Sequence, residues 1–328
     1  MQNRKQTAKQ VSELTQKIRD FFTNQNFLEV QTPILTPKPG MEPYLTPFET
    51  TLNIAHQKPQ KLFLNTSPEL QMKKLLGEGF GDIFNITKVF RDCEINGPQH
   101  NPEFTMLEWY RENANYLDLM KDCQNLITSL GYQNKKIDTE TQWERKTTQE
   151  LFLHHLKIDL LENQTFEEFK KTAEKIKLDT TGCETWDEIY FKLFLNHIEP
   201  NLPKNQPIFI YDYPATQAAL AKKSDKNPFF AERFELYING IELCNAFSEL
   251  TDPIEQKQRL KDEQVERKNM NKTVFDIDEE FLSSLESIQS PCAGIAMGLD
   301  RLFMILLDKA SIEDLLLFPL NKMINQQQ

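Results

Sequence analysis

Residues 100–110 read His-Asn-Pro-Glu-Phe-Thr-Met-Leu-Glu-Trp-Tyr, and from residue 103 onward the side chains alternate as in a β-strand. One face of this strand carries Phe104, Met106, Glu108 and Tyr110. An aromatic ring, a carboxylate and a phenol on one face suit a cleft that stacks a planar group and binds a cation. An ordinary cluster between neighbouring strands is the alternative interpretation.

A second strand is predicted just upstream, over residues 83–91. Its residues are apolar on both faces, which is typical of a buried central strand, yet it ends in Arg91. A buried arginine is costly unless an anion meets it. The pattern therefore indicates an anion site at Arg91, or else a salt bridge to Asp92 or Glu94.

A third strand, over residues 292–298, carries almost no side chains on one face, where Gly294, Ala296 and Gly298 alternate. Bare backbone of this kind usually lets a ligand or another chain come close. Asp300 and Arg301 open the apolar helix that follows, and an arginine in a first turn opposes the helix dipole. We therefore expect Arg301 to meet an anion such as phosphate.

The rest of the chain supplies further strands and helices. Helical spacing begins at Val11, and five prolines between residues 33 and 47 predict an ordered loop. Asn239-Gly240 predicts a hairpin between strands 231–238 and 241–247, followed by a charged helix at 253–269. Together these elements predict one α+β domain over residues 1–328, a mainly antiparallel sheet flanked by helices, with a helical insertion at about residues 113–206.

Composition restricts the environment and the partners. The longest strictly apolar run is the six residues 302–307, far short of a membrane span, and the N-terminus lacks a signal-peptide core. The five cysteines form no C-x-x-C pair, which argues against a disulfide scaffold or a structural zinc site. These features predict a reduced, cytoplasmic protein with no membrane partner. A net charge of −11 disfavours binding to a long stretch of nucleic acid.

Several motifs now resemble one known family. Phe90-Arg91 together with residues 100–110 resembles motif two of class II aminoacyl-tRNA synthetases, in its lysyl-type version. Residues 294–302 resemble motif three, and the helix running into Glu29-Val-Gln-Thr-Pro33 resembles motif one, which forms the dimer interface. Thr66-Ser-Pro-Glu69 and residues 240–250 complete the set. The resemblance implies a class II synthetase catalytic core and a homodimer.

Lysyl-tRNA synthetases carry an N-terminal anticodon-binding domain, and here motif one begins too early to leave room for one. The chain therefore most resembles the free-standing lysyl-type ligases that modify elongation factor P. That resemblance implies activation of (R)-β-lysine by ATP as an aminoacyl-adenylate, then transfer to a lysine ε-amine of elongation factor P, with no role for tRNA.

The resemblance also implies roles for individual residues. Arg91 and Arg301 would be catalytic, contacting the α- and γ-phosphates of ATP, and Glu242 would hold Mg²⁺. The other ATP-binding residues would be Glu94, His100, Asn101, Phe104, Leu243 and Gly298. The amino-acid substrate would be bound by Ser67, Glu69, Tyr110, Asn245, Glu249 and Ala296. Glu69 and Glu249 would supply the two anionic ends that a dicationic substrate needs.

Some positions depart from the family pattern. The usual F-R-x-E reads Phe90-Arg91-Asp92-Cys93-Glu94, so the acidic role of Glu94 stays open. Ala296 stands where lysyl-tRNA synthetases have glycine. The alternatives are a truncated lysyl-tRNA synthetase-like enzyme that charges tRNA, and a non-catalytic regulatory paralogue. Loss of Arg91 or Arg301 would favour the paralogue, and both are present.

Overall fold

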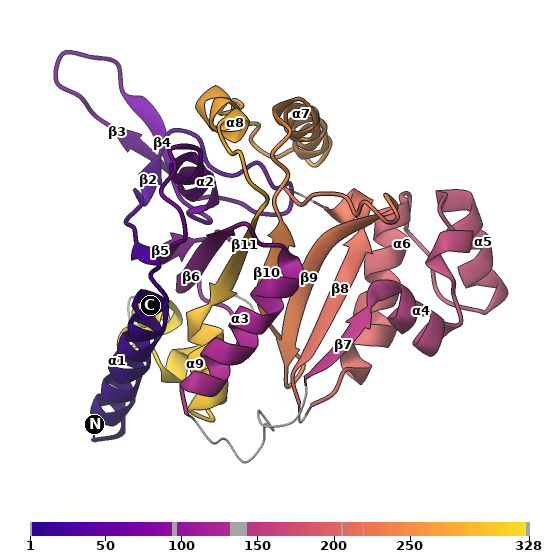
Figure 1. Cartoon of the computed structure of the whole chain (residues 1–328), viewed down its shortest axis with the longest axis horizontal. Helices are drawn as coiled ribbons and strands as arrows, with labels where there is room; N and C mark the ends of the chain where they lie inside the picture. The colour runs from indigo at the N-terminus through magenta and orange to yellow at the C-terminus, as the bar shows by residue number, and fades with distance from the viewer. Residues whose placement is uncertain (1, 94–96, 132–142, 205, 219, 326–328) are drawn as a thin grey trace.

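An eight-stranded sheet forms the centre of the protein (Figure 1). The computed structural model describes residues 2–93, 97–131, 143–204, 206–218 and 220–325. The order across the sheet is β1 (Leu28–Glu29), β5 (Ile83–Phe90), β6 (Glu103–Glu112), β11 (Cys292–Gly298), β10 (Ile241–Ser248), β9 (Phe230–Ile238), β8 (Ile208–Pro214) and β7 (Glu144–Thr147). The pairs at the two edges, β1–β5 and β7–β8, are parallel and the pairs between them antiparallel. The predicted fold class is confirmed.

Helices cover both faces of this sheet. One face packs against α1 (Gln2–Thr23), α3 (Tyr116–Ser129) and α9 (Leu299–Leu306). Above the other face lie α2 (Glu69–Gly77), α7 (Pro253–Asn269) and α8 (Glu279–Glu286), beside a small sheet of β2 (Leu35–Thr36), β4 (Gln60–Leu64) and β3 (Glu49–Leu52) (Figure 1). The last helix in the described part of the chain is α10 (Leu320–Asn325). No helix in the described ranges has the length and apolar character needed to cross a membrane.

The register of β6, β11 and β10 separates a core face from a polar face. Ala296 of β11 lies opposite Glu108 on one side and Asn245 on the other, so these three side chains share the polar face. The alternate residues, among them Trp109 and Met297, are fully buried against the helices. The alternation predicted for residues 103–111 is confirmed, and it places the polar row at the centre of the sheet.

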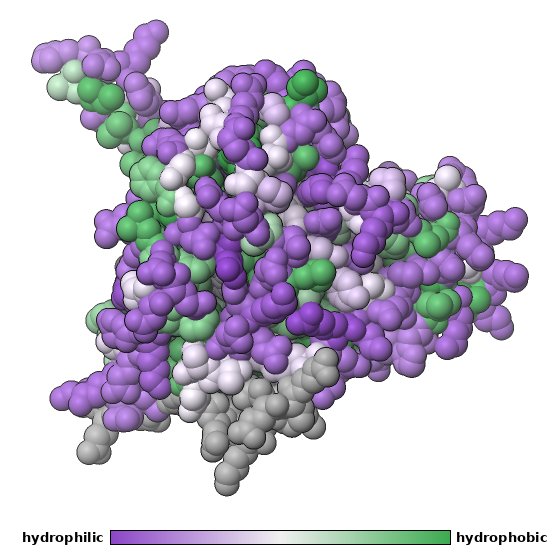
Figure 2. All heavy atoms as spheres, viewed as in Figure 1, coloured by the Kyte–Doolittle hydropathy of each residue, from purple (hydrophilic) through white to green (hydrophobic). Residues whose placement is uncertain are grey.

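Helix α1 is fixed to the core face by aromatic contacts. The ring of Phe22 lies 4.9 Å from that of Phe84 and 5.1 Å from that of Trp109, centroid to centroid. Around β1 and β2, which follow this helix, the apolar side chains of Leu28, Ile34 and Leu35 are 50%, 40% and 41% exposed. Figure 2 shows apolar surface on this side of the molecule. An uncovered apolar edge next to motif one is a candidate contact with a second copy.

Between residues 113 and 206 the structure contains two kinds of element. Helix α3 packs into the main core, and β7 is an edge strand of the large sheet. Helices α4 (Thr148–Leu156), α5 (Phe166–Lys175) and α6 (Trp186–Leu193) instead surround their own apolar cluster, in which Phe152 stacks on Tyr190. The insertion boundary at about residues 113–206 therefore stays a prediction.

The proline-rich segment at residues 33–47 is held in place by a buried arginine of α7. Arg267 is 1% exposed, and its Nη1 donates to the carbonyl oxygens of Glu42 at 2.8 Å and Leu45 at 3.0 Å. Its Nε donates to the carbonyl of Thr273 at 2.7 Å. Lys272 Nζ also donates to the carbonyl of Pro43 at 2.7 Å, so two side chains hold the backbone of this segment.

Replacing Arg267 with leucine is expected to lower the free energy of unfolding by about 2 kcal/mol, because the buried guanidinium loses its hydrogen bonds to three backbone carbonyls. Lys268→Leu, at the exposed neighbouring position, is the control and should stay within about 0.5 kcal/mol of the parent. Urea unfolding measures both. Equal effects of the two substitutions would contradict the assignment.

Candidate active site

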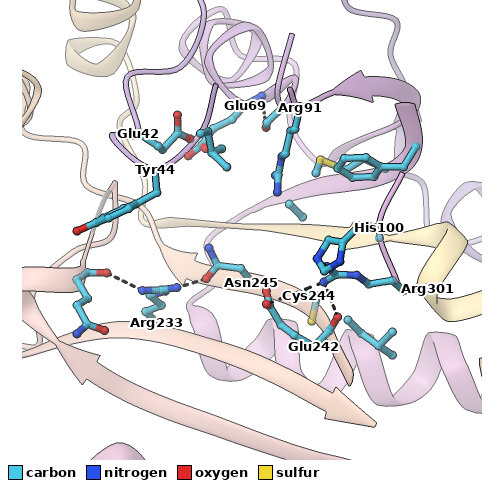
Figure 3. A pocket seen from close by; sticks show the side chains of 18 of the residues that line it. Glu42, Tyr44, Glu69, Arg91, His100, Arg233, Glu242, Cys244, Asn245 and Arg301 are labelled. Carbon is cyan, nitrogen blue, oxygen red and sulfur yellow. Dashed lines mark hydrogen bonds and ion pairs between the residues drawn. The ribbon is translucent and has the colours of Figure 1, made fainter. Parts of the chain in front are cut away.

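A cavity of about 430 Å³ lies over the polar face of β6, β11 and β10 (Figure 3). It is lined by most of the residues expected from the sequence: Ser67, Glu69, Arg91, His100, Asn101, Phe104, Glu242, Leu243, Asn245, Ala296, Gly298 and Arg301. Tyr110 and Glu249 lie outside this lining. Glu94 falls outside the described residues. Segments far apart in the chain thus meet around one hollow.

Arg91 enters the cavity from the end of β5. Its Nε donates to the carbonyl of Thr66 at 3.4 Å, and its guanidinium carbon lies 5.2 Å from the centre of the Phe104 ring. The ring supports the flat guanidinium by a cation–π contact. Arg91 is thereby held at the cavity wall beside the aromatic residue expected to stack on adenine.

Arg301 enters from the first turn of α9. Its Nη1 donates to the carbonyl of Glu242 at 3.0 Å, and its Nη2 lies 3.0 Å from Nε2 of His100. Because an arginine can only donate, Nε2 of His100 is the acceptor of that contact. These contacts aim the guanidinium at the cavity, where Figure 3 shows it facing the same space as Arg91.

A second arginine network, missed in the sequence, orients Asn245. Arg233 Nε donates to Asn245 Oδ1 at 2.8 Å, and Arg233 Nη2 lies 2.6 Å from Glu235 Oε1. With its oxygen engaged, Asn245 turns its amide nitrogen into the cavity (Figure 3). The sequence signal was present but weak, since Arg233 and Glu235 stand two apart on one strand face. The amide is placed to donate to a carboxylate or phosphate oxygen.

A bulge in β10 explains how two residues three apart both reach the cavity. The pairing of β10 with β9 shifts register between Glu242 and Cys244. In a regular strand, Glu242 and Asn245 would point to opposite faces, and the extra residue of a bulge reverses this. Both side chains therefore line the cavity.

Behind the cavity lies a buried cluster of charged groups centred on Lys73, which the sequence analysis did not single out. The Lys73 side chain is 1% exposed, and its Nζ lies 2.5 Å from Glu69 Oε1 and 2.6 Å from Glu249 Oε2. The four-residue spacing of Glu69 and Lys73 on a helix indicated a salt bridge. The sequence could not indicate its burial or the approach of Glu249.

Glu108 of β6 completes this cluster. Tyr110 donates its hydroxyl to Glu108 Oε1 at 2.7 Å, and Ser67 donates to Oε2 at 2.9 Å. Burial, reinforced by the charge of Glu69, raises the pKa of Glu108 to about 8. Burial also raises the pKa of Glu249 to about 8, although Lys73 acts in the opposite direction. Carboxyl groups held this way become ionised most readily when a cation arrives.

The two glycines of β11 have different neighbours. A Cβ at Gly294 would lie 2.2 Å from Cε1 of Tyr110 and 2.4 Å from Oε1 of Glu249. The bare face at Gly294 is therefore filled by the protein's own side chains. A Cβ at Gly298 would meet no atom nearer than Arg301 Cδ at 3.7 Å. At Gly298 the protein itself leaves room for a side chain. A ligand in the cavity would use this space by approaching the bare backbone.

Glu242 is the carboxylate best placed for a nucleotide-bound cation. Its side chain is 42% exposed, and its Oε2 lies 4.0 Å from Nη1 of Arg301. Partial desolvation by the surrounding cavity wall and the charge of Glu235 raise its pKa to about 7. In the described part of the chain no three His, Cys, Asp or Glu residues form a metal-binding group. Mg²⁺ held mainly by phosphates and water needs only one or two carboxylates, and Glu242 fits that requirement.

Comparison with known proteins places this site in a family. The model for class II tRNA synthetases of the D, K and N type matches residues 1–322. The chain therefore belongs to the class II aminoacyl-tRNA synthetase family, as its motifs predicted.

The curated relatives are more specific. A protein of Buchnera aphidicola (subsp. Acyrthosiphon pisum, strain APS) is 40% identical over 314 residues, which cover 95% of this chain and 94% of the relative. Relatives from Pectobacterium atrosepticum and Histophilus somni (strain 2336) are 38% and 39% identical, each covering 93% of this chain and 92% of the relative. All three are named elongation factor P–(R)-β-lysine ligase.

The glycine geometry predicts opposite outcomes for two similar substitutions. Gly294→Ala should destabilise the protein by about 1–3 kcal/mol, because the methyl group overlaps Tyr110 and Glu249. Gly298→Ala should leave stability nearly unchanged and weaken ATP binding. Urea unfolding and ATP titration calorimetry measure the two effects. A Gly298 variant that binds ATP normally would refute the inferred ligand contact.

Proposed function

We propose that the protein activates (R)-β-lysine with ATP and transfers the β-lysyl group to a lysine ε-amine of elongation factor P. The observation that carries the proposal is the set of charged groups around the cavity. Arg91 and Arg301 line the cavity together with Glu69, and the buried carboxyl groups of Glu108 and Glu249 lie behind its wall. The cavity thus matches a polyphosphate joined to a diamino acid. The names of the relatives supply the acceptor protein.

In the first step a carboxylate oxygen of β-lysine attacks the α-phosphorus of ATP, and pyrophosphate leaves. Negative charge gathers on the phosphate oxygens, so fixed positive groups lower the barrier. Arg91 would stabilise the α-phosphate, Arg301 the γ-phosphate, and the Asn245 amide would orient the attacking carboxylate. Mg²⁺ bound with ATP would be held by Glu242 and would neutralise part of the phosphate charge. Phe104 would stack on adenine.

In the second step the neutral ε-amine of the acceptor attacks the carbonyl carbon of the adenylate. An amide bond forms, AMP leaves and the amine loses a proton. Acidic side chains of Glu42, Asp187, Glu263 and Glu266 also line the cavity. Such a lining attracts a lysine and repels nucleic-acid phosphates, as does the net charge of −11. We therefore propose a protein acceptor in place of tRNA.

We further propose a homodimer that pairs through the motif-one region, where Leu28, Ile34 and Leu35 are exposed. The five cysteines are free thiols, of which four are buried, in keeping with the reduced, cytoplasmic environment that we propose.

The test is ATP–pyrophosphate exchange with (R)-β-lysine and with α-lysine, followed by mass measurement of elongation factor P and of tRNA-Lys. We expect exchange, and a mass gain on elongation factor P alone. Arg91→Ala and Arg301→Ala should each reduce exchange by about 100-fold or more, since each removes a contact to developing charge. Arg145→Ala, at an exposed position of the edge strand β7, is the control.

Charging of tRNA-Lys without modification of elongation factor P would favour the truncated synthetase. Absence of exchange with every amino acid tested would favour the regulatory paralogue.

The Ala296 methyl group lies in the cavity between Glu108 and Asn245, and we expect it to influence the choice between α- and β-lysine. One methyl group of this kind is worth roughly 10- to 200-fold in discrimination. Ala296→Gly should raise exchange with α-lysine relative to β-lysine. Ala246→Gly, whose methyl group faces the core, is the control. An unchanged ratio in the Ala296 variant would leave this residue a packing role only.

A further inference from the structure

Lys73 is buried in the middle of α2 and does not line the cavity, yet it connects two carboxylates that the proposed function assigns to the substrate. Glu69 lines the cavity with 15% of its side chain exposed, whereas Glu249 is 1% exposed. The Lys73 ammonium contacts both, at 2.5 and 2.6 Å. The lysine therefore bridges the cavity wall and the carboxylate behind it.

The contacts around Nζ leave little room for movement. The Phe247 ring lies over it at 5.0 Å from the ring centre. Glu249 is anchored by its backbone, whose N–H donates to the carbonyl of Cys292 at 2.9 Å. Glu249 Oε2 faces Lys73, and Oε1 has no hydrogen-bond partner among the described residues. A buried carboxylate oxygen without a partner is ready to accept from a ligand ammonium.

We propose that Lys73 is a positioning residue for the amino-acid substrate, holding Glu69 and Glu249 as a fixed pair of carboxylates. The charge count supports this role. Glu69, Glu108 and Glu249 contribute three negative charges when ionised, and Lys73 cancels one of them. Burial raises the pKa of Glu42, the fourth carboxyl near Lys73, which favours its neutral form. The two that remain match the two ammonium groups of a diamino acid. This inference rests on the proposed function, because it assigns the ligand of these carboxylates.

The electrostatics of the cluster give this role a pH signature. The titratable groups that interact with Lys73 are Glu69 on its own helix, Glu249 beyond β10, Glu108 on β6, Cys292 on β11 and Glu42 on the proline-rich loop. The Tyr110 hydroxyl is bonded to Glu108. Burial raises the pKa of Glu249, and the positive charge of Lys73 lowers it. Without the ammonium, Glu249 would be protonated up to a higher pH.

The direction of the pH effect on lysine affinity follows from the charge of Glu249. An ammonium group binds the ionised carboxylate, so affinity for lysine improves as pH rises through the pKa of Glu249. Loss of an opposite charge at this distance moves such a pKa upward by about one unit or more. The pH above which KM for lysine levels off should therefore move upward when Lys73 is neutral.

The experiment measures KM and kcat for (R)-β-lysine in pyrophosphate exchange between about pH 6.5 and 9.5. In Lys73→Gln we expect KM at pH 7 to rise about tenfold, the KM profile to shift upward by about one pH unit, and kcat at saturation to change little. Lys73→Arg, which keeps the charge, should restore the parent profile. Lys74→Gln is the matched control, since Lys74 pairs with Asp278 and Glu280 outside the cluster.

An unshifted KM profile in a folded Lys73→Gln protein would overturn the proposal. So would loss of folding in both Lys73→Gln and Lys73→Met, since the role would then be structural. The parent protein is measured first with α- and β-lysine. If it exchanges with neither, the proposed function fails, and that result is distinct from an unshifted variant.

Discussion

The register of β6, β11 and β10 is the constraint on which the rest of the structure depends. Because side chains alternate along each strand, the pairing of Glu108, Ala296 and Asn245 sends these residues to one face and Trp109 with its neighbours to the other. A slip of one residue would bury the polar row and expose the core. The packing of α1, α3 and α9 on the apolar face fixes this register, and the cavity forms over the opposite face.

The cavity over that polar face brings arginines and carboxyl groups together. Two arginines, held by carbonyl, ring and imidazole contacts, face the cavity near β5 and α9. Carboxyl groups gather around Lys73 behind the cavity wall, and its ammonium offsets part of their charge. Burying charges is costly unless each has a partner, and here the partners are supplied partly by the fold. A ligand with complementary charge would supply the remaining partners.

Local pattern predicted much of this arrangement. Strand alternation predicted β6 and β11, and the Asn239-Gly240 turn predicted the hairpin of β9 and β10, with φ of 55° and 72° at its two residues. The unfavourable placement of Arg301 in a helix start correctly indicated contacts outside its own helix. These inferences succeeded because each depends on residues close together in the chain.

What the sequence did not reveal depends on distant segments. Lys73 and Glu249 are 176 positions apart, and only the approach of α2 to the end of β10 makes them a buried pair. The same packing fills the space over Gly294, where bare backbone had suggested an approaching ligand. We propose that Arg91 and Arg301 hold the phosphates of the ligand and that the carboxyl groups around Lys73 hold both amines. This can be tested with a crystal structure containing a non-hydrolysable β-lysyl-adenylate analogue. We predict the phosphate at Arg91 and the amino groups within reach of Glu69, Glu108 and Glu249. An analogue bound in the reverse direction, or amino groups at Glu242, would contradict the account.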